Sequence, residues 1–156
     1  MSSKEKSESR SMVTFLIHGQ EYGMKTEAIR SIIPVGDMTF VPGAPSSVAG
    51  VINLRGDIIP VVELEGTTRD DDAPWEEGLA LVVEIPDDAE DLAVALMVDE
   101  VTQVDRADFA RIEDTDELMV ARDRADAVIG VLSRSDGPLL ILDPAGLVPE
   151  EKEVGA

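Results

Sequence analysis

Short apolar runs, separated by polar or turn-forming residues, follow one another along most of the chain. The first extends from Met12 to Ile17, meets a polar turn at 18–21, and resumes at Tyr22. This order predicts an opening β-hairpin. Helical periodicity is scarce elsewhere, and the spacing of the runs is typical of an all-β protein.

One segment, 26–33, fits either a helix or a strand. Ile29, Ile32 and Ile33 would share a helical face, but Pro34 stops the segment soon afterwards. A strand with a bulge accounts for the same residues equally well. Both alternatives stay open at this point.

The middle of the chain predicts two strands, 48–54 and 57–64, joined by a turn at Arg55 and Gly56. An irregular extended stretch at 40–45 precedes them, because prolines and a glycine interrupt it. Pro60 cannot donate a hydrogen bond to a neighbouring strand. We therefore expect its strand to lie at a sheet edge or to carry a bulge.

The second half of the chain predicts two further hairpins. Val101 and Val104 look like an alternating extension of the strand that precedes them. A final helical turn is expected at 143–148. The predicted strands pair 79–85 with 92–98 across the loop 86–91, and 128–133 with 138–142 across 134–137, where Asp136 and Gly137 favour a tight turn.

About nine short strands with hairpin connections favour barrels or a sandwich, and two small barrels fit 156 residues. We expect a flexible polar tail at 1–10, one domain at 11–150 and a frayed end at 151–156. The segments 65–78 and 86–91 are acidic and are expected to be surface loops.

The net charge of the chain limits the kinds of molecule that it can bind. The chain has 33 acidic and 13 basic residues, a formal net charge of −20, so nucleic acid is an unsuitable partner. Adaptation to high salt is one hypothesis, because molar salt screens such self-repulsion; an ordinary acidic protein is the alternative. A third alternative, calcium binding at 70–72 and 87–91, lacks the spaced oxygen ligands and turn glycine of a calcium loop.

Little catalytic chemistry is available. With no cysteine and only His18, which we expect in a solvent-facing turn, thiol catalysis and zinc sites are excluded, and we predict no catalytic residue, metal or cofactor. Asp99 and Asp143 each follow an apolar strand, where an acid caps a turn or meets an arginine. A small carboxylate-using β-barrel hydrolase built on these two acids is the competing hypothesis.

The chain also lacks any apolar run of membrane-spanning length and any secretion signal at its first residues. We therefore expect a cytoplasmic protein without direct membrane insertion. Against the acidic background Arg55 stands out at its turn, because an arginine flanked by apolar strand residues is typical of an interface anchor, although a merely solvated arginine fits the pattern too.

The stretch Gly50-Val-Ile-Asn-Leu-Arg-Gly56, continued by Ile58-Ile-Pro-Val-Val62 and Leu64, closely resembles the signature of the CheW family. Three further stretches agree in the expected order, so that the resemblance extends over about residues 12–148. They are Tyr22-Gly23, Val98-Asp-Glu-Val101 with Val104, and Ile129-Gly-Val131 leading into Leu140-Ile-Leu-Asp143.

The resemblance implies two interleaved five-stranded SH3-like barrels with a hydrophobic groove between them. It also implies an adaptor that couples methyl-accepting chemotaxis receptors to the histidine kinase CheA at membrane-associated receptor arrays. A CheW-like adaptor for another two-component pathway, such as surface motility, is the alternative. Ser31 departs from the glutamate of many relatives. The implied interface residues are Asn53, Arg55 and Gly56 in the turn, and Ile29, Ile32, Val98 and Val101 along the groove.

Overall fold

The computed structural model describes residues 9–36, 38–43, 48–64, 78–85, 92–114 and 127–147. Most of the predicted tail, the frayed end and the two acidic loops lie outside the described residues, as do both acidic runs considered for calcium. Within the described part, no helix has the length and apolar character needed to cross a membrane.

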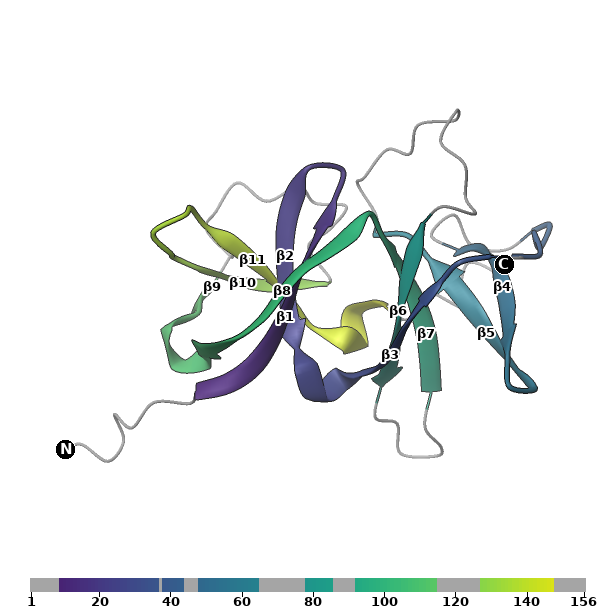
Figure 1. The fold of residues 1–156 in the computed structure, drawn as a ribbon, viewed down its shortest axis with the longest axis horizontal. Helices are drawn as coiled ribbons and strands as arrows, with labels where there is room; N and C mark the ends of the chain where they lie inside the picture. Colours follow the sequence, from purple (N-terminus) through teal and green to yellow (C-terminus); the bar gives the residue numbers. More distant parts are fainter. Residues whose placement is uncertain are drawn as a thin grey trace.

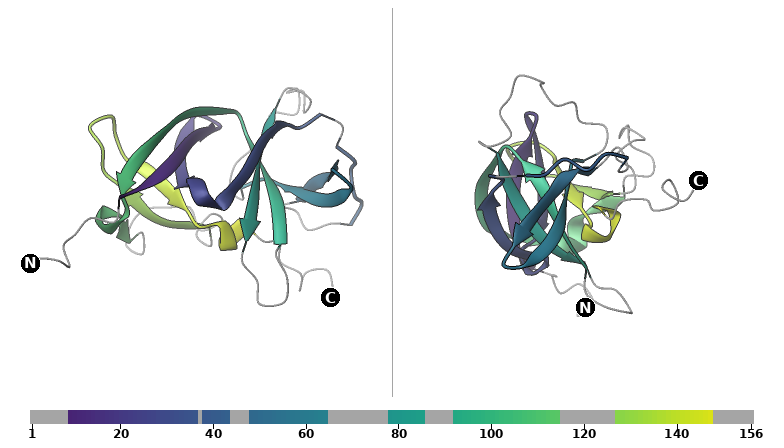
Figure 2. Two further views of the ribbon diagram at one scale, coloured as in Figure 1. Left: turned by 60° about the horizontal axis from the view of Figure 1, so that its bottom comes forward. Right: turned by 90° about the vertical axis from the view of Figure 1, so that its right-hand side faces the viewer.

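The described strands form two sheets, each curled into a small barrel, and the barrels lie side by side along the long axis of the molecule (Figures 1 and 2). The first barrel has the strand order β8-β1-β2-β11-β10-β9. Its strands are β1 (Ser9–Ile17), β2 (Gln20–Lys25), β8 (Glu100–Asp108), the two-residue β9 (Glu113–Asp114), β10 (Val128–Leu132) and β11 (Leu139–Leu142).

The second barrel has the order β3-β6-β7-β5-β4 and is inserted between β2 and β8 of the first, so the barrels are interleaved in sequence. The predicted all-β fold of two small barrels is confirmed, with β9 as a short addition. The strands are β3 (Ile29–Pro34), β4 (Val48–Leu54), β5 (Asp57–Val62), β6 (Leu79–Ile85) and β7 (Leu92–Val98); short 3-10 turns occupy η2 (Thr26–Ala28), η4 (Phe109–Arg111) and η6 (Pro144–Leu147).

The predicted hairpins are confirmed in the pairs β1–β2, β4–β5, β6–β7 and β10–β11, all antiparallel. The ambiguous segment 26–33 resolves into the turn η2 followed by β3. The pairing of β3 with β6 shifts register between Ile29 and Ser31. The strand with a bulge was therefore the better of the two alternatives.

Pro60 is tolerated for a reason that the sequence did not suggest. Its strand β5 lies inside the sheet, between β4 and β7, so the predicted edge position is wrong; the pair does contain a bulge, but on β4, between Val48 and Gly50, rather than at Pro60. Pro60 opposes Val51, whose N–H and C=O both bond to Thr39, at 2.8 and 2.9 Å. Because the backbone polar groups of Val51 point away from β5, no bond to β4 is lost at Pro60. On the other side, the pairing of β5 with β7 begins only at Val61.

The prediction that Val101 and Val104 extend the strand before them is wrong. Both lie in β8, which pairs with β1 of the first barrel, whereas β7 belongs to the second. The chain passes from one barrel to the other at Asp99. Such a change of sheet depends on distant pairing partners, which local alternation does not reveal.

A continuous hydrophobic core joins the two barrels. Its largest cluster draws Phe15 and Tyr22 from the first barrel and Leu81 and Leu96 from the second. The rings of Phe15 and Tyr22 stack with centroids 6.2 Å apart. The interior of the second barrel contains a separate cluster around Val61, so that β6 and β7 are buried on both faces. The barrels are therefore held against each other by side-chain packing as well as by the chain.

Candidate partner-binding surface

The β4–β5 turn lies at the end of the second barrel (Figure 1), and Arg55 within this turn is exposed. Leu54 pairs with Asp57, so the loop contains only Arg55 and Gly56. Both have positive φ, 56° and 91°. Two-residue hairpin loops favour this geometry because its twist matches the twist of the strands. Asn53 stabilises the turn, since its Oδ1 accepts a hydrogen bond from the Gly56 N–H at 2.9 Å.

Arg55 is one of three described arginines, with Arg106 and Arg111, that have no carboxylate partner among the described residues. No ion pair or hydrogen bond joins it to another residue within the described segments, which leaves its guanidinium group available. Three other arginines pair with glutamates: Arg10 with Glu27 at 3.6 Å, Arg30 with Glu84 at 3.6 Å and Arg134 with Glu21 at 2.7 Å.

The predicted groove residues divide into two kinds. Ile29 and Val101, from different barrels, are partly buried and pack against the same shared core. Ile32 is 44% exposed on β3. Val98 is only 3% exposed and belongs to the core, so its predicted place in a contact surface is corrected: it supports the junction from inside. The turn residues and groove residues form separate parts of the surface.

Four exposed apolar residues were missed as surface candidates; one of them, Ile129 on β10, is 47% exposed. Ile58 is 63% exposed and opposes Asn53 across the β4–β5 pair, so both side chains share the outward face. Phe40, 71% exposed, follows the bridge between Thr39 and Val51. Strand alternation could have shown that either Ile58 or Ile59 faces outward, but not which of the two, because that depends on the register of β5. The fourth, Val104, is 61% exposed on β8, and its orientation depends on a bulge.

The two acids of the hydrolase hypothesis act as turn caps. Asp99 Oδ2 accepts a hydrogen bond from the His18 N–H at 2.7 Å. Asp143 Oδ1 accepts one from the Ala145 N–H at 3.3 Å, at the start of η6. His18 is exposed in the β1–β2 turn, as predicted. Within the segments that the structure covers, no group of three acids or histidines is placed to hold a metal ion.

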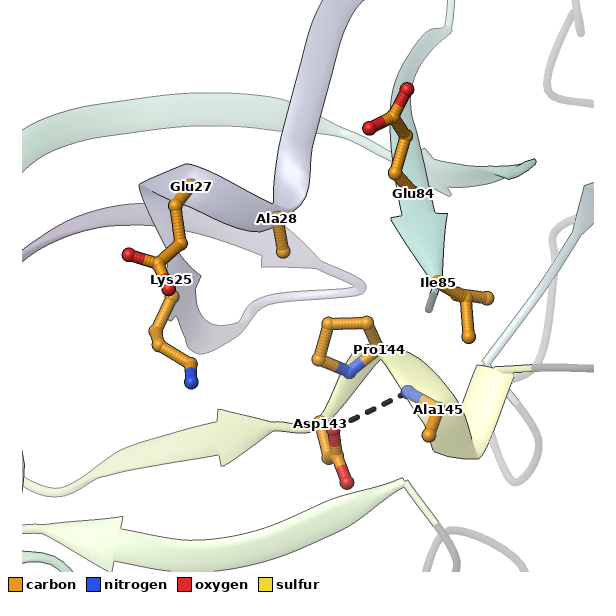
Figure 3. A pocket seen from close by; sticks show the side chains of 8 residues that line it. All are labelled: Lys25, Glu27, Ala28, Glu84, Ile85, Asp143, Pro144 and Ala145. Carbon is orange, nitrogen blue, oxygen red and sulfur yellow. Dashed lines mark hydrogen bonds between the residues drawn. The ribbon is translucent and has the colours of Figure 1, made fainter. Parts of the chain in front are cut away.

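An open pocket of about 520 Å³ lies where η2, the end of β6 and η6 meet (Figure 3). Its floor is apolar and its rim is charged. The two rim glutamates already pair with Arg10 and Arg30 at 3.6 Å, so the rim is not a cluster of unpaired acids. The lining residues are Lys25, Glu27, Ala28, Glu84, Ile85, Asp143, Pro144 and Ala145.

Known proteins resemble the chain over nearly all its length. The chemotaxis protein CheW of Bacillus subtilis is 26% identical over 145 residues, covering 93% of this chain and 90% of that protein. The CheW of Rhizobium meliloti is 26% identical over 148 residues, covering 94% and 92%. Among solved structures, the scaffolding protein TtCheW from Thermoanaerobacter tengcongensis superimposes with a TM-score of 0.72 at 26% identity, covering 86% of this chain and 84% of that one.

The sequence pattern that defines the CheW-like domain matches residues 11–152. This range includes both barrels, the Arg55 turn and the crossover at Asp99. Members of the family are scaffold proteins rather than known enzymes. The chain belongs to the CheW-like domain family, and its function is that of a chemotaxis scaffold or adaptor.

Proposed function

We propose that the protein couples methyl-accepting chemotaxis receptors to the histidine kinase CheA in the cytoplasm, at membrane-associated receptor arrays, by protein contacts and without catalysis. The observation that carries the proposal is the exposed Arg55 at the tip of the β4–β5 turn. In a chain of net charge −20, an arginine without an acidic partner among the described residues is available to a partner.

The chemistry of the side chain supports the same proposal. A residue other than glycine at positive φ costs about 1 kcal/mol or more. The two-residue loop imposes this cost on Arg55 and on His18 alike, so the guanidinium group rather than the backbone distinguishes Arg55. Its planar guanidinium group can bind a partner carboxylate with two parallel hydrogen bonds.

The second contact that we propose lies between the barrels. Ile29 and Val101 each pack against the shared core, from different barrels, and Ile32 leaves apolar surface in water. A helical receptor segment with an apolar face would cover such side chains. Each contact can be weak, because an array repeats it many times and gains avidity.

Replacing Arg55 by Glu tests the proposal in a capture assay with purified CheA and the cytoplasmic fragment of a receptor at fixed KCl. We expect capture to weaken about tenfold, or about 1.4 kcal/mol, because a cation becomes an anion facing the partner acid. Arg55→Lys should retain part of the affinity, since it keeps the charge but loses the planar fork.

Arg111→Glu is the matched control. Arg111 is also exposed and has no acidic partner among the described residues, but it lies on η4 of the first barrel. It should leave capture unchanged. Equal weakening by both variants would show only a response to net charge, and unchanged capture by Arg55→Glu would refute the role of the turn.

A further inference from the structure

A bulge in β8 decides which way its valines face. Phe15 pairs with Val101 and Thr14 with Gln103, so Thr102 is an extra residue without an opposing partner on β1. Val104 then pairs with Val13. In a regular strand, residues three apart point to opposite faces. Because of the extra residue, Val101 and Val104 share the face that carries Phe15 and Val13.

Side-chain hydrogen bonds hold the bulge. Glu21 can only accept, so Thr102 Oγ1 donates to Glu21 Oε2 at 3.2 Å. The hydroxyl oxygens of Thr14, which is 1% exposed, and Thr102 are hydrogen-bonded at 2.7 Å, and Thr14 Oγ1 also reaches the Gln103 C=O at 3.3 Å. Arg134 Nη2 donates to the other oxygen of Glu21 at 2.7 Å. The bulge is thus tied to β1, β2 and the β10–β11 turn. We call Thr14, Glu21, Thr102 and Arg134 the bulge clamp.

The start of β8 has a second anchor three residues earlier. The N–H of Asp99 donates to the Leu16 C=O at 2.8 Å, and its carboxylate accepts from His18 at 2.7 Å. Val101 therefore lies between two fixed points, Asp99 and Thr102. Its side chain packs on the shared core, while Val104 remains 61% exposed.

We infer that the bulge clamp is a positioning device that places Val101 and Val104 on one face, where both contact the apolar side of a helical receptor segment. The inference rests on the proposed function, and it adds Val104 to the contact surface and Thr102 to the residues that set its shape. Thr102 acts through the valines, since its own hydroxyl group is occupied within the chain.

Thr102→Val tests the clamp because it keeps the branched shape and removes the hydroxyl group. We expect faster amide hydrogen exchange at 101–104 and about fivefold weaker receptor capture, with capture of CheA unchanged. Thr102→Ser restores the hydroxyl group and should restore both exchange protection and capture. Val104→Asp should weaken receptor capture at least as much, without lowering the melting temperature, because the side chain is exposed.

Any of three results would overturn the inference. Unchanged exchange in Thr102→Val would show that the hydroxyl group does not hold the bulge. Faster exchange with unchanged receptor capture, or unchanged capture by Val104→Asp, would show that the valines do not contact the receptor. If the unaltered protein captured neither receptor nor CheA, the proposed function itself would fail, and the inference with it.

Discussion

Two turns of the molecule share a backbone geometry and differ in what surrounds them. His18 and Gly19 close the β1–β2 hairpin with φ of 50° and 82°, and Arg55 and Gly56 close the β4–β5 hairpin with 56° and 91°. The first turn is bonded to Asp99 at the crossover between barrels, whereas the second, as far as the described residues show, is bonded only within its own hairpin, from Gly56 to Asn53.

Hairpin geometry alone therefore does not make a contact site. In the β1–β2 turn, the backbone N–H of His18 donates a hydrogen bond to Asp99, so this turn helps to stabilise the junction between the barrels. In the β4–β5 turn, Arg55 is a cation that has no acidic partner among the described residues. The distinction arises from tertiary neighbours, which is why only one of two similar turns is a candidate for binding.

Added salt should change the stability of the protein more than any substitution below, and this change should not distinguish the two turns. Because screening reduces the self-repulsion of a chain with net charge −20, we expect the melting temperature to rise by about 5 °C or more, roughly 2 kcal/mol, between about 0.1 M and 1 M KCl. Thermal melts at graded KCl check this. Arg55→Glu makes the charge two units more negative and should steepen the rise; a flat profile would end the salt-adaptation hypothesis.

Removing the side chain that accepts a hydrogen bond from each turn should lower the stability of the protein by different amounts. Asp99→Ala breaks the bond across the junction and should lower the free energy of unfolding by about 1–2 kcal/mol, since the lost bond involves a charged acceptor. Asn53→Ala removes only a bond within its own turn and should cost about 0.5–1 kcal/mol. Urea unfolding measures both. A larger loss for Asn53→Ala would reverse the comparison.

Replacing the glycine of each turn by alanine should lower the stability by the same amount in both turns. The added Cβ of Gly19→Ala or Gly56→Ala would meet no atom within 4 Å, so the cost arises from positive φ alone. We expect about 1 kcal/mol in each case. Unequal losses in the same unfolding assay would mean that the surroundings strain one turn more than the other.

Asparagine at the first position of each turn should give the smallest change in stability and the clearest change in function. Asn tolerates positive φ, so His18→Asn and Arg55→Asn should each stabilise the fold by about 0.5 kcal/mol. Only Arg55→Asn should weaken capture of CheA and receptor. If His18→Asn weakened capture equally, the two turns could no longer be assigned different roles.

The sequence was sufficient for the hairpins and for the all-β fold, because strand alternation and turn residues act locally. It could not show that the chain changes barrel at Asp99, since the partner of β8 is β1, many residues away. The bulge at Thr102 was hidden for the same reason: a spacing of three between Val101 and Val104 acquires its meaning only from the register with Phe15.

The surface candidates were predictable in part. Arg55 could be singled out because it is a cation beside a turn glycine in an acidic chain. Val98 was placed on the groove because it belongs to the family motif, yet it is 3% exposed, and motif membership does not separate core from contact residues. Ile58 and Ile59 are chemically identical neighbours, and only the register of β5 decides which one faces water.

The core shared by both barrels determines how the protein unfolds. It contains Phe15, Tyr22, Leu81 and Leu96. Cleavage of the chain between β7 and β8 would expose the apolar core surface of each fragment to water. It would also divide the first barrel, because β1 and β2 precede the second barrel in the sequence and β8 to β11 follow it. Neither half could persist alone. Heating should therefore melt the whole protein in one cooperative transition rather than barrel by barrel.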